Sequence, residues 1–179
     1  MFAGNRTSVD AMWQDRVRRG SPTFRSGCRR VTASRMERVE EGMTNGPVMD
    51  IRNRDDIARL VEAFYTRAFT DPVLGPIFID VAQMDLEAHM PIMCDFWENI
   101  LFRTGRYPGG LMMVHFQLHA KTPLLPEHFE IWLAYWHRTV DDLFTGERAN
   151  LVKTHATNVA IAMSGRLNSS PRAMTPTSR

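Results

Sequence analysis

The chain has 179 residues, which is enough for one domain with a hydrophobic core. Hydrophobic residues make up 44% of it and the formal net charge is +2, as in many soluble globular proteins. No run of about eighteen uncharged apolar residues occurs, so we expect no membrane contact. The N-terminus lacks the basic-then-apolar layout of a secretory signal, so we expect a cytoplasmic protein.

The two ends of the chain differ in composition from the middle. Residues 1–48 are rich in Arg, Ser, Thr and Gly, with few apolar residues at regular spacing, which is typical of a disordered extension. Residues 168–179 are a similar polar tail. The expected folded domain is residues 49–167, in which fifteen acidic residues outnumber eleven basic ones. This acidic balance argues against a nucleic-acid partner.

Helical spacing of apolar residues dominates the expected domain. A first helix is predicted to begin after Asn53, a residue that favours helix starts, and to end before Pro72. The apolar stretch VLGPIF that follows indicates a connector with a helical turn. Pro91 lies near the start of the next helix and predicts a kink or an irregular start there. No segment predicts a strand, so the expected fold class is all-α. Four further helices are expected, over about 84–102, 111–120, 126–144 and 146–166.

Histidines are the residues best able to carry metal chemistry. His115 and His119 are four residues apart and share one face of the short third helix. Two histidines at this spacing can bind zinc, but Phe116 stands where the HExxH motif has glutamate. A haem site needs only one axial ligand, commonly histidine, and an apolar slot between helices. Three further histidines are expected to face solvent: His128, His137 and His155.

Four motifs favour the haem interpretation over the zinc interpretation. They are AFYTRAFTDPVLGPIF (63–78), HMPIMCDFWENIL (89–101), GLMMVHFQLH (110–119) and HFEIWLAYW (128–136). In this order they resemble the group III truncated haemoglobins, a mainly bacterial family. The resemblance implies a shortened globin fold, a helical sandwich around one haem b. It also implies that the chain binds oxygen, nitric oxide and carbon monoxide.

The resemblance assigns roles to individual residues. His115 matches the proximal ligand of a five-coordinate iron, although Leu111 stands near a point where the family usually has proline. Tyr65, His89 and Trp132 match the distal residues, which would also serve any catalysis. Other matched positions line the pocket: Phe64, Phe78, Met93, Phe96 and Trp97.

Two of the distal residues are hydrogen-bond donors. The phenol O–H of Tyr65 and the indole N–H of Trp132 can stabilise a ligand that carries negative charge. Such bonds contribute about 1–3 kcal/mol each, so two could slow ligand loss by several decades. The haem propionates need cations at the mouth of the slot, and the candidates are Arg103, Arg106 and Lys121.

Two alternatives stay open. The haem protein could also turn over oxygen, nitric oxide or peroxide, as a nitric oxide dioxygenase or a peroxidase does. The chain carries no flavin or nicotinamide motif, so that activity would need a separate reductase. A non-haem helical module, binding a metal or a protein partner through His115 and His119, is the other alternative.

Overall fold

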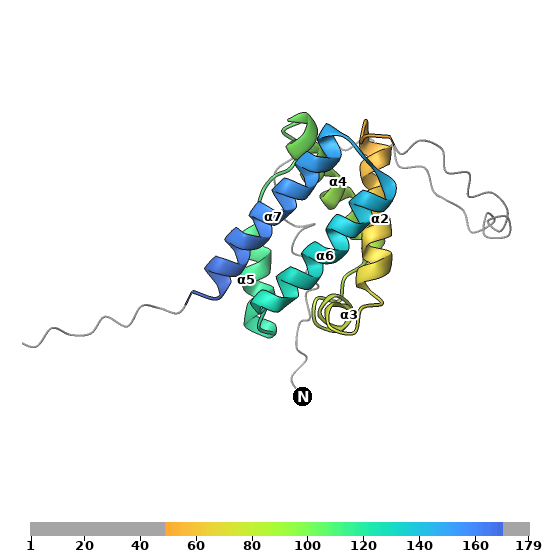
Figure 1. The fold of residues 1–179 in the computed structure, drawn as a ribbon. Helices are drawn as coiled ribbons and strands as arrows, with labels where there is room; N and C mark the ends of the chain where they lie inside the picture. The colour runs from red at the N-terminus through yellow and green to blue at the C-terminus, as the bar shows by residue number, and fades with distance from the viewer. Residues whose placement is uncertain (1–48, 170–179) are drawn as a thin grey trace, which may run out of the picture.

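The structure is a computed structural model, and it describes residues 49–169. The predicted extension 1–48 and all but the first two residues of the predicted tail 168–179 lie outside the described residues. Within 49–169 the structure contains helices and no strand, which confirms the all-α fold class. No described helix is long and apolar enough to cross a membrane. The elements are α2 (Arg54–Ala68), α3 (Leu74–Pro76), the π-helix η2 (Ile77–Val81), α4 (Leu86–Phe102), α5 (Leu111–Lys121), α6 (Pro126–Leu143) and α7 (Glu147–Leu167) (Figure 1).

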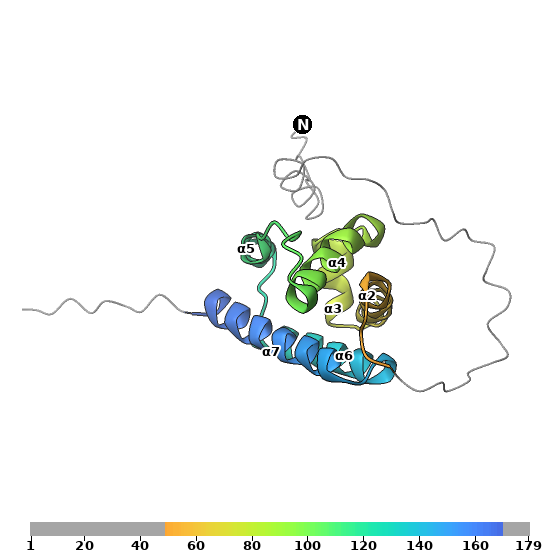
Figure 2. The ribbon, with the colours of Figure 1, turned by 90° about the horizontal axis from the view of Figure 1, so that it is seen from above.

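The four longest helices form a two-layer sandwich. Helix α2 packs against α4 in one layer, and α6 packs against α7 in the other. Helix α2 also contacts α6, and α4 contacts α7, so the larger of two clusters of buried residues lies between the layers (Figure 2). Helix α5 lies at one side of the sandwich, where it contacts α7 (Figure 2).

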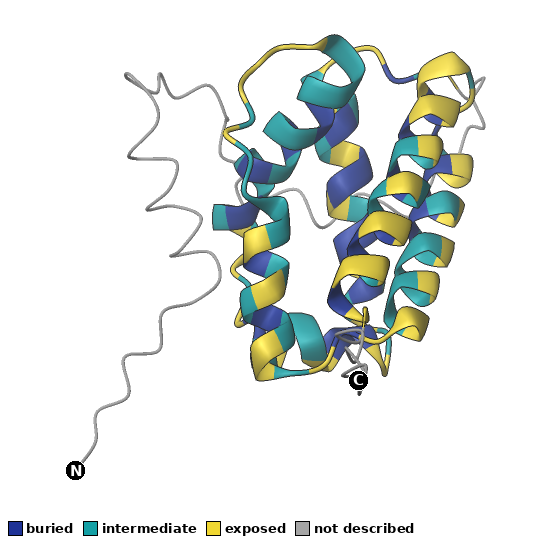
Figure 3. Ribbon diagram, turned by 90° about the vertical axis from the view of Figure 1, so that its left-hand side faces the viewer, coloured by how far each residue is buried: buried dark blue, intermediate teal, exposed yellow. Residues whose placement is uncertain are grey.

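Tryptophan side chains form the centre of the core. Trp97 of α4 and Trp136 of α6 are fully buried, and their rings stack 4.6 Å apart with an interplanar angle of 17°. The ring of Trp132 also stacks with that of Trp136, with centroids 5.6 Å apart and an interplanar angle of 4°. Stacked aromatic rings contribute beyond the apolar area that they bury, so this column ties α4 to α6. Buried residues lie on the inner sides of the helices and exposed residues on the outer sides (Figure 3).

Side-chain caps set where α2 and α4 begin. Asn53 accepts a hydrogen bond from the backbone N–H of Asp56 (3.0 Å), as its residue type predicts. Asp85 accepts the backbone N–H groups of Glu87 and Ala88, so α4 begins two residues later than the apolar spacing predicts.

Pro91 lies inside α4, and the helix continues through it to Phe102. The backbone irregularity lies before the helix, at Gln83, whose φ is +52°. The carbonyl oxygen of Pro91 accepts a hydrogen bond from the Arg54 guanidinium at 3.3 Å. Arg54 also forms ion pairs with Asp95 and Glu98, so the start of α2 holds the middle of α4.

The connector between α2 and α4 is more regular than its sequence indicates. After the short α3, the backbone N–H of Ala82 bonds to the carbonyl oxygen of Ile77 at 2.9 Å, five residues back. This is the hydrogen bond of a π-helix, a rare element that often occurs at functional sites. Apolar spacing cannot distinguish such a turn from an irregular connector.

Asp50 joins the start of the described chain to the start of α7. Its carboxylate accepts the backbone N–H groups of Arg148 (3.0 Å) and Ala149 (2.9 Å), which belong to the first turn of α7. Gly146 precedes this turn with φ at +137°, and a Cβ there would lie 2.5 Å from Cγ of Asp50. Glycine at this position therefore allows Asp50 to act as the missing N-terminal cap.

Candidate functional site

A large apolar cavity lies between the layers and extends to α5. Its empty space is about 1130 Å³, including the part that is open to solvent. Among residues 49–169, no Asp, Glu, Lys or Arg lines it. Eight of the predicted site residues do: Tyr65, Phe78, His89, Met93, Phe96, Trp97, His115 and Trp132.

His115 is held in a fixed orientation on α5. Its Nδ1–H donates a hydrogen bond to the carbonyl oxygen of Leu111, one turn earlier, at 2.8 Å. The carbonyl can only accept, so this bond places the ring proton on Nδ1 and leaves Nε2 with its lone pair. Metal-binding histidines are usually oriented by such a bond from the other ring nitrogen.

Burial favours the form of His115 that can bind a metal. Burial lowers the pKa of His115 below its ordinary value of 6.5, the hydrogen bond to Leu111 raises it, and the nearby charge of His89 lowers it further. The net direction is downward, so the ring is neutral near pH 7. A neutral imidazole is the state that metal binding requires. Both histidines, His89 on α4 and His115 on α5, line the cavity.

His119 has a different task on the same helix. Its Nδ1 accepts the backbone N–H of Leu124 at 3.0 Å, which closes the turn between α5 and α6. His119 does not line the cavity. Within residues 49–169 no group of three or more His, Cys, Asp or Glu residues could hold a metal ion. The geometry therefore distinguishes the two neighbouring histidines and gives no support to a zinc site built on both.

Tyr65 and His89 lie together at the cavity wall. The two buried rings meet edge to face, with centroids 5.6 Å apart and an interplanar angle of 87°. Phe78 of the π-helix contacts the Tyr65 ring at 5.7 Å, so α2, η2 and α4 each contribute one ring to this group. The predicted distal residues Tyr65 and His89 are thus brought into contact.

Trp132 belongs to the cavity wall, and Phe64 belongs to the layer behind it. Trp132 lines the cavity, and the edge of the Phe64 ring packs against it at 5.6 Å. Phe64 itself is buried behind Tyr65 and Trp132 and is not part of the cavity lining. Its spacing on α2 places it beside Tyr65, so it supports the two cavity residues rather than forming the wall.

The predicted cations do not line the cavity. Arg103 is the exposed residue at which α4 ends, with φ at +54°. Arg106 is 62% exposed in its side chain and lies 3.4 Å from a carboxylate oxygen of Glu98. Lys121 is exposed at the end of α5. A charged residue beside a loop is a weak indicator of a cavity mouth, because it also satisfies ordinary surface pairing.

Two polar cavity residues were not expected from the sequence. His128 was expected to face solvent, but it lines the cavity from the first turn of α6. Its spacing of four residues from Trp132 places both on one face of the helix, and that signal could have identified it. Tyr107 lines the cavity from the loop between α4 and α5, where no periodic pattern exists. His137, another histidine expected to face solvent, contacts Thr157 of α7 at 3.2 Å.

The donor set of the cavity fits a haem. The walls are apolar and aromatic, as a macrocycle requires, and one histidine offers a free Nε2 on them. The lining also includes a phenol, an imidazole and an indole, all of which can donate hydrogen bonds.

Comparisons with known proteins agree with this geometry. No protein-family model matches the chain. Over 111 residues the chain is 31% identical to the protein named group 3 truncated hemoglobin ctb from Campylobacter jejuni, covering 60% of this chain and 85% of that protein. The structure is also similar to the crystal structure of a group III truncated hemoglobin from Campylobacter jejuni. The TM-score is 0.59 at 29% identity, over 66% of this chain and 94% of the other. The chain therefore belongs to the group III truncated haemoglobins.

Proposed function

We propose that the chain binds one haem b in the cavity, with His115 as the axial ligand. Diatomic gases such as oxygen, nitric oxide and carbon monoxide would bind on the side of Tyr65, His89 and Trp132. The observation that carries this proposal is the 2.8 Å hydrogen bond from His115 Nδ1–H to Leu111, which leaves Nε2 available at the cavity wall. When bound, the haem would supply an iron centre that takes up such a gas.

The protein contributes the orientation and protonation state of the ligand histidine. The hydrogen bond to Leu111 holds the imidazole plane, and burial keeps the ring neutral. A fixed neutral ring loses little freedom when a metal binds, and it releases no proton from Nε2. These two effects favour His115 over the five other histidines.

The side of the cavity with Tyr65, His89 and Trp132 would contribute hydrogen-bond donors in surroundings that exclude water. Tyr65 and His89 are buried, and the residues around them are mainly apolar. Hydrogen-bond donors act more strongly on a polar ligand where water is excluded. The Tyr65 hydroxyl and the Trp132 indole N–H would therefore slow the escape of oxygen, which favours retention over rapid delivery.

Absorption spectroscopy of the full chain reconstituted with haemin tests the proposal. We expect a Soret band in the wild type, loss of that band in His115→Ala, and its survival in His119→Ala. The His119 variant is the matched control, because that residue lies one turn away on the same helix and outside the cavity lining. The absence of a Soret band in the reconstituted wild type would overturn the proposal.

A further inference from the structure

His128 is a polar residue on the cavity wall, and the proposed binding of iron and gas does not involve it. It lies in the first turn of α6, and Trp132, one turn later, lines the same cavity. The backbone N–H of Leu125 donates to Nδ1 of His128 at 3.2 Å. Because Nδ1 accepts this bond, the neutral ring carries its proton on Nε2 and can donate from there.

The position of His128 suits a ligand group that stays partly in water. His128 is half-buried, whereas its neighbours Leu125, Pro126 and Glu127 are exposed. The cavity therefore comes close to the surface at the start of α6. Carboxylates are costly to bury without partners, so the acidic groups of a cavity ligand belong at such a mouth.

The walls offer few other partners for an acidic group. In the part of the chain that the structure describes, no lysine or arginine lines the cavity. Of the three histidines that do, His115 is the proposed iron ligand and His89 packs edge to face against Tyr65. A haem carries two propionate carboxylates, and His128 is the remaining histidine that can donate to one of them.

We propose that the Nε2–H of His128 donates a hydrogen bond to a propionate of the bound haem. This inference rests on the proposed haem binding. It assigns to an imidazole of α6 the contact that a lysine or arginine commonly makes with a carboxylate. The bond would hold the outer edge of the cofactor and slow its release, while His115 holds the centre.

Two substitutions test the roles of the two ring nitrogens of His128 separately. Asparagine places an acceptor near the position of Nδ1 and keeps the bond from Leu125, but it has no group that reaches the position of Nε2. Glutamine extends an amide to about the position of Nε2 and keeps a donor there. His155→Asn is the matched control, because His155 lies on α7 and does not line the cavity.

The test measures haem release from the full chain to an excess of apomyoglobin, with haemin and with haemin dimethyl ester, whose propionates are esterified. With haemin we expect release from His128→Asn to be about three- to tenfold faster than from the wild type, as for a partly exposed bond to a charged group. Release from His128→Gln and His155→Asn is expected to stay within about twofold of the wild type. With the diester the difference between His128→Asn and the wild type is expected to disappear.

The outcomes distinguish the two proposals. Equal acceleration in His128→Asn with haemin and with the diester would show that His128 acts through packing, and would overturn the inference. Unchanged release from His128→Asn with haemin would overturn it as well. If the wild type takes up neither cofactor, the proposed haem binding fails before His128 is tested. Thermal unfolding of the apoproteins verifies that the variants fold.

Discussion

His115 and Leu111 are joined by a hydrogen bond of 2.8 Å within one turn of α5, and this bond places the ring proton on Nδ1 and leaves Nε2 with its lone pair. His119, one turn further on, accepts a backbone N–H from Leu124 instead. Two histidines that the sequence presents as equivalent thus differ in their partners. One is oriented for ligation and the other closes a turn.

Replacing His119 is predicted to affect stability and to leave cofactor binding intact. His119→Ala removes the acceptor for the N–H of Leu124, a buried residue. A buried donor left without a partner costs about 1–3 kcal/mol, so we expect the free energy of unfolding to fall by about 1–2 kcal/mol. Urea unfolding of the apoprotein measures this. His119→Asn keeps an acceptor near Nδ1 and is expected to lose less. A loss of haem affinity in His119→Ala comparable to that in His115→Ala would contradict the assignment.

Replacing Tyr65 is predicted to speed ligand loss. Tyr65→Phe keeps the ring contacts with Phe78 and His89 but removes the hydroxyl from the cavity wall. One hydrogen bond to a charged group is worth about 1.5–3 kcal/mol, so oxygen dissociation is expected to become at least about tenfold faster in stopped flow.

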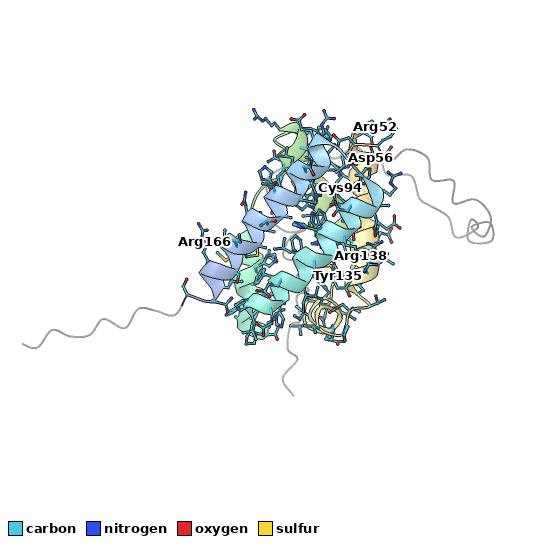
Figure 4. All side chains as sticks on the ribbon, in the orientation of Figure 1. Arg52, Asp56, Cys94, Tyr135, Arg138 and Arg166 are labelled. Carbon is cyan, nitrogen blue, oxygen red and sulfur yellow. The ribbon has the colours of Figure 1, made fainter. Side chains whose placement is uncertain are left out.

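A second tyrosine serves as the control for Tyr65. Tyr135→Phe removes a hydroxyl that donates to Asp71 at 3.0 Å, on the part of α6 labelled in Figure 4 and outside the cavity lining. Its oxygen dissociation rate is expected to equal that of the wild type. Equal rates in Tyr65→Phe and the wild type would remove Tyr65 from the ligand-stabilising role.

The helices could be predicted because their signals are local, whereas only the family resemblance separated His115 from His119, and its role as ligand stays a prediction. Apolar spacing and capping residues such as Asn53 depend only on neighbours along the chain. The helices begin within about two residues of the positions that these signals predict. The π-helix and the burial of Phe64 depend on packing between α2, η2 and α6, which no single segment encodes. His128 was missed for a related reason, since a polar residue in the first turn of a helix usually faces solvent.

The cap that Asp50 provides is predicted to make stability depend on acid pH. Burial raises the pKa of Asp50, but hydrogen bonds from the N–H groups of Arg148, Ala149 and Ile51 outweigh it, so the pKa lies below its ordinary value of 3.8. The carboxylate therefore stabilises the fold fully above about pH 4, and this contribution is lost as the pH falls through the lowered pKa.

Asp50→Ala tests this dependence. The variant is expected to lose about 1–2 kcal/mol at pH 7, as for the loss of a helix N-cap, and to differ less from the wild type near pH 2. Thermal unfolding of both proteins between pH 2 and pH 7 measures the difference. A difference that stays constant across that range would show that the charge of Asp50 does not contribute.

The ion pairs of Arg54 are predicted to matter more than those of its neighbour Arg52. Arg54 binds Asp95 at 2.6 Å as well as Glu98, whose side chain is only 9% exposed. Arg54→Ala would leave Glu98 with the more distant and exposed Arg106. Removing one partner of a buried pair leaves an uncompensated charge and costs about 3–5 kcal/mol; because Arg54 is partly exposed, we expect about 2–3 kcal/mol.

Arg52 provides a control of the same residue type at the start of the same helix. Its guanidinium is 58% exposed and lies 3.8 Å from Asp56 at the upper end of α2 (Figure 4). Exposed ion pairs contribute about 0–1 kcal/mol, so Arg52→Ala is expected to unfold at nearly the wild-type denaturant concentration.

Because Arg54 also bonds to Pro91 within the helix that carries His89, Arg54→Ala is expected to loosen α4 locally. Hydrogen exchange should then show faster exchange in α4 for Arg54→Ala and unchanged exchange for Arg52→Ala. Equal destabilisation in the two variants would show that the buried carboxylate of Glu98 does not depend on Arg54.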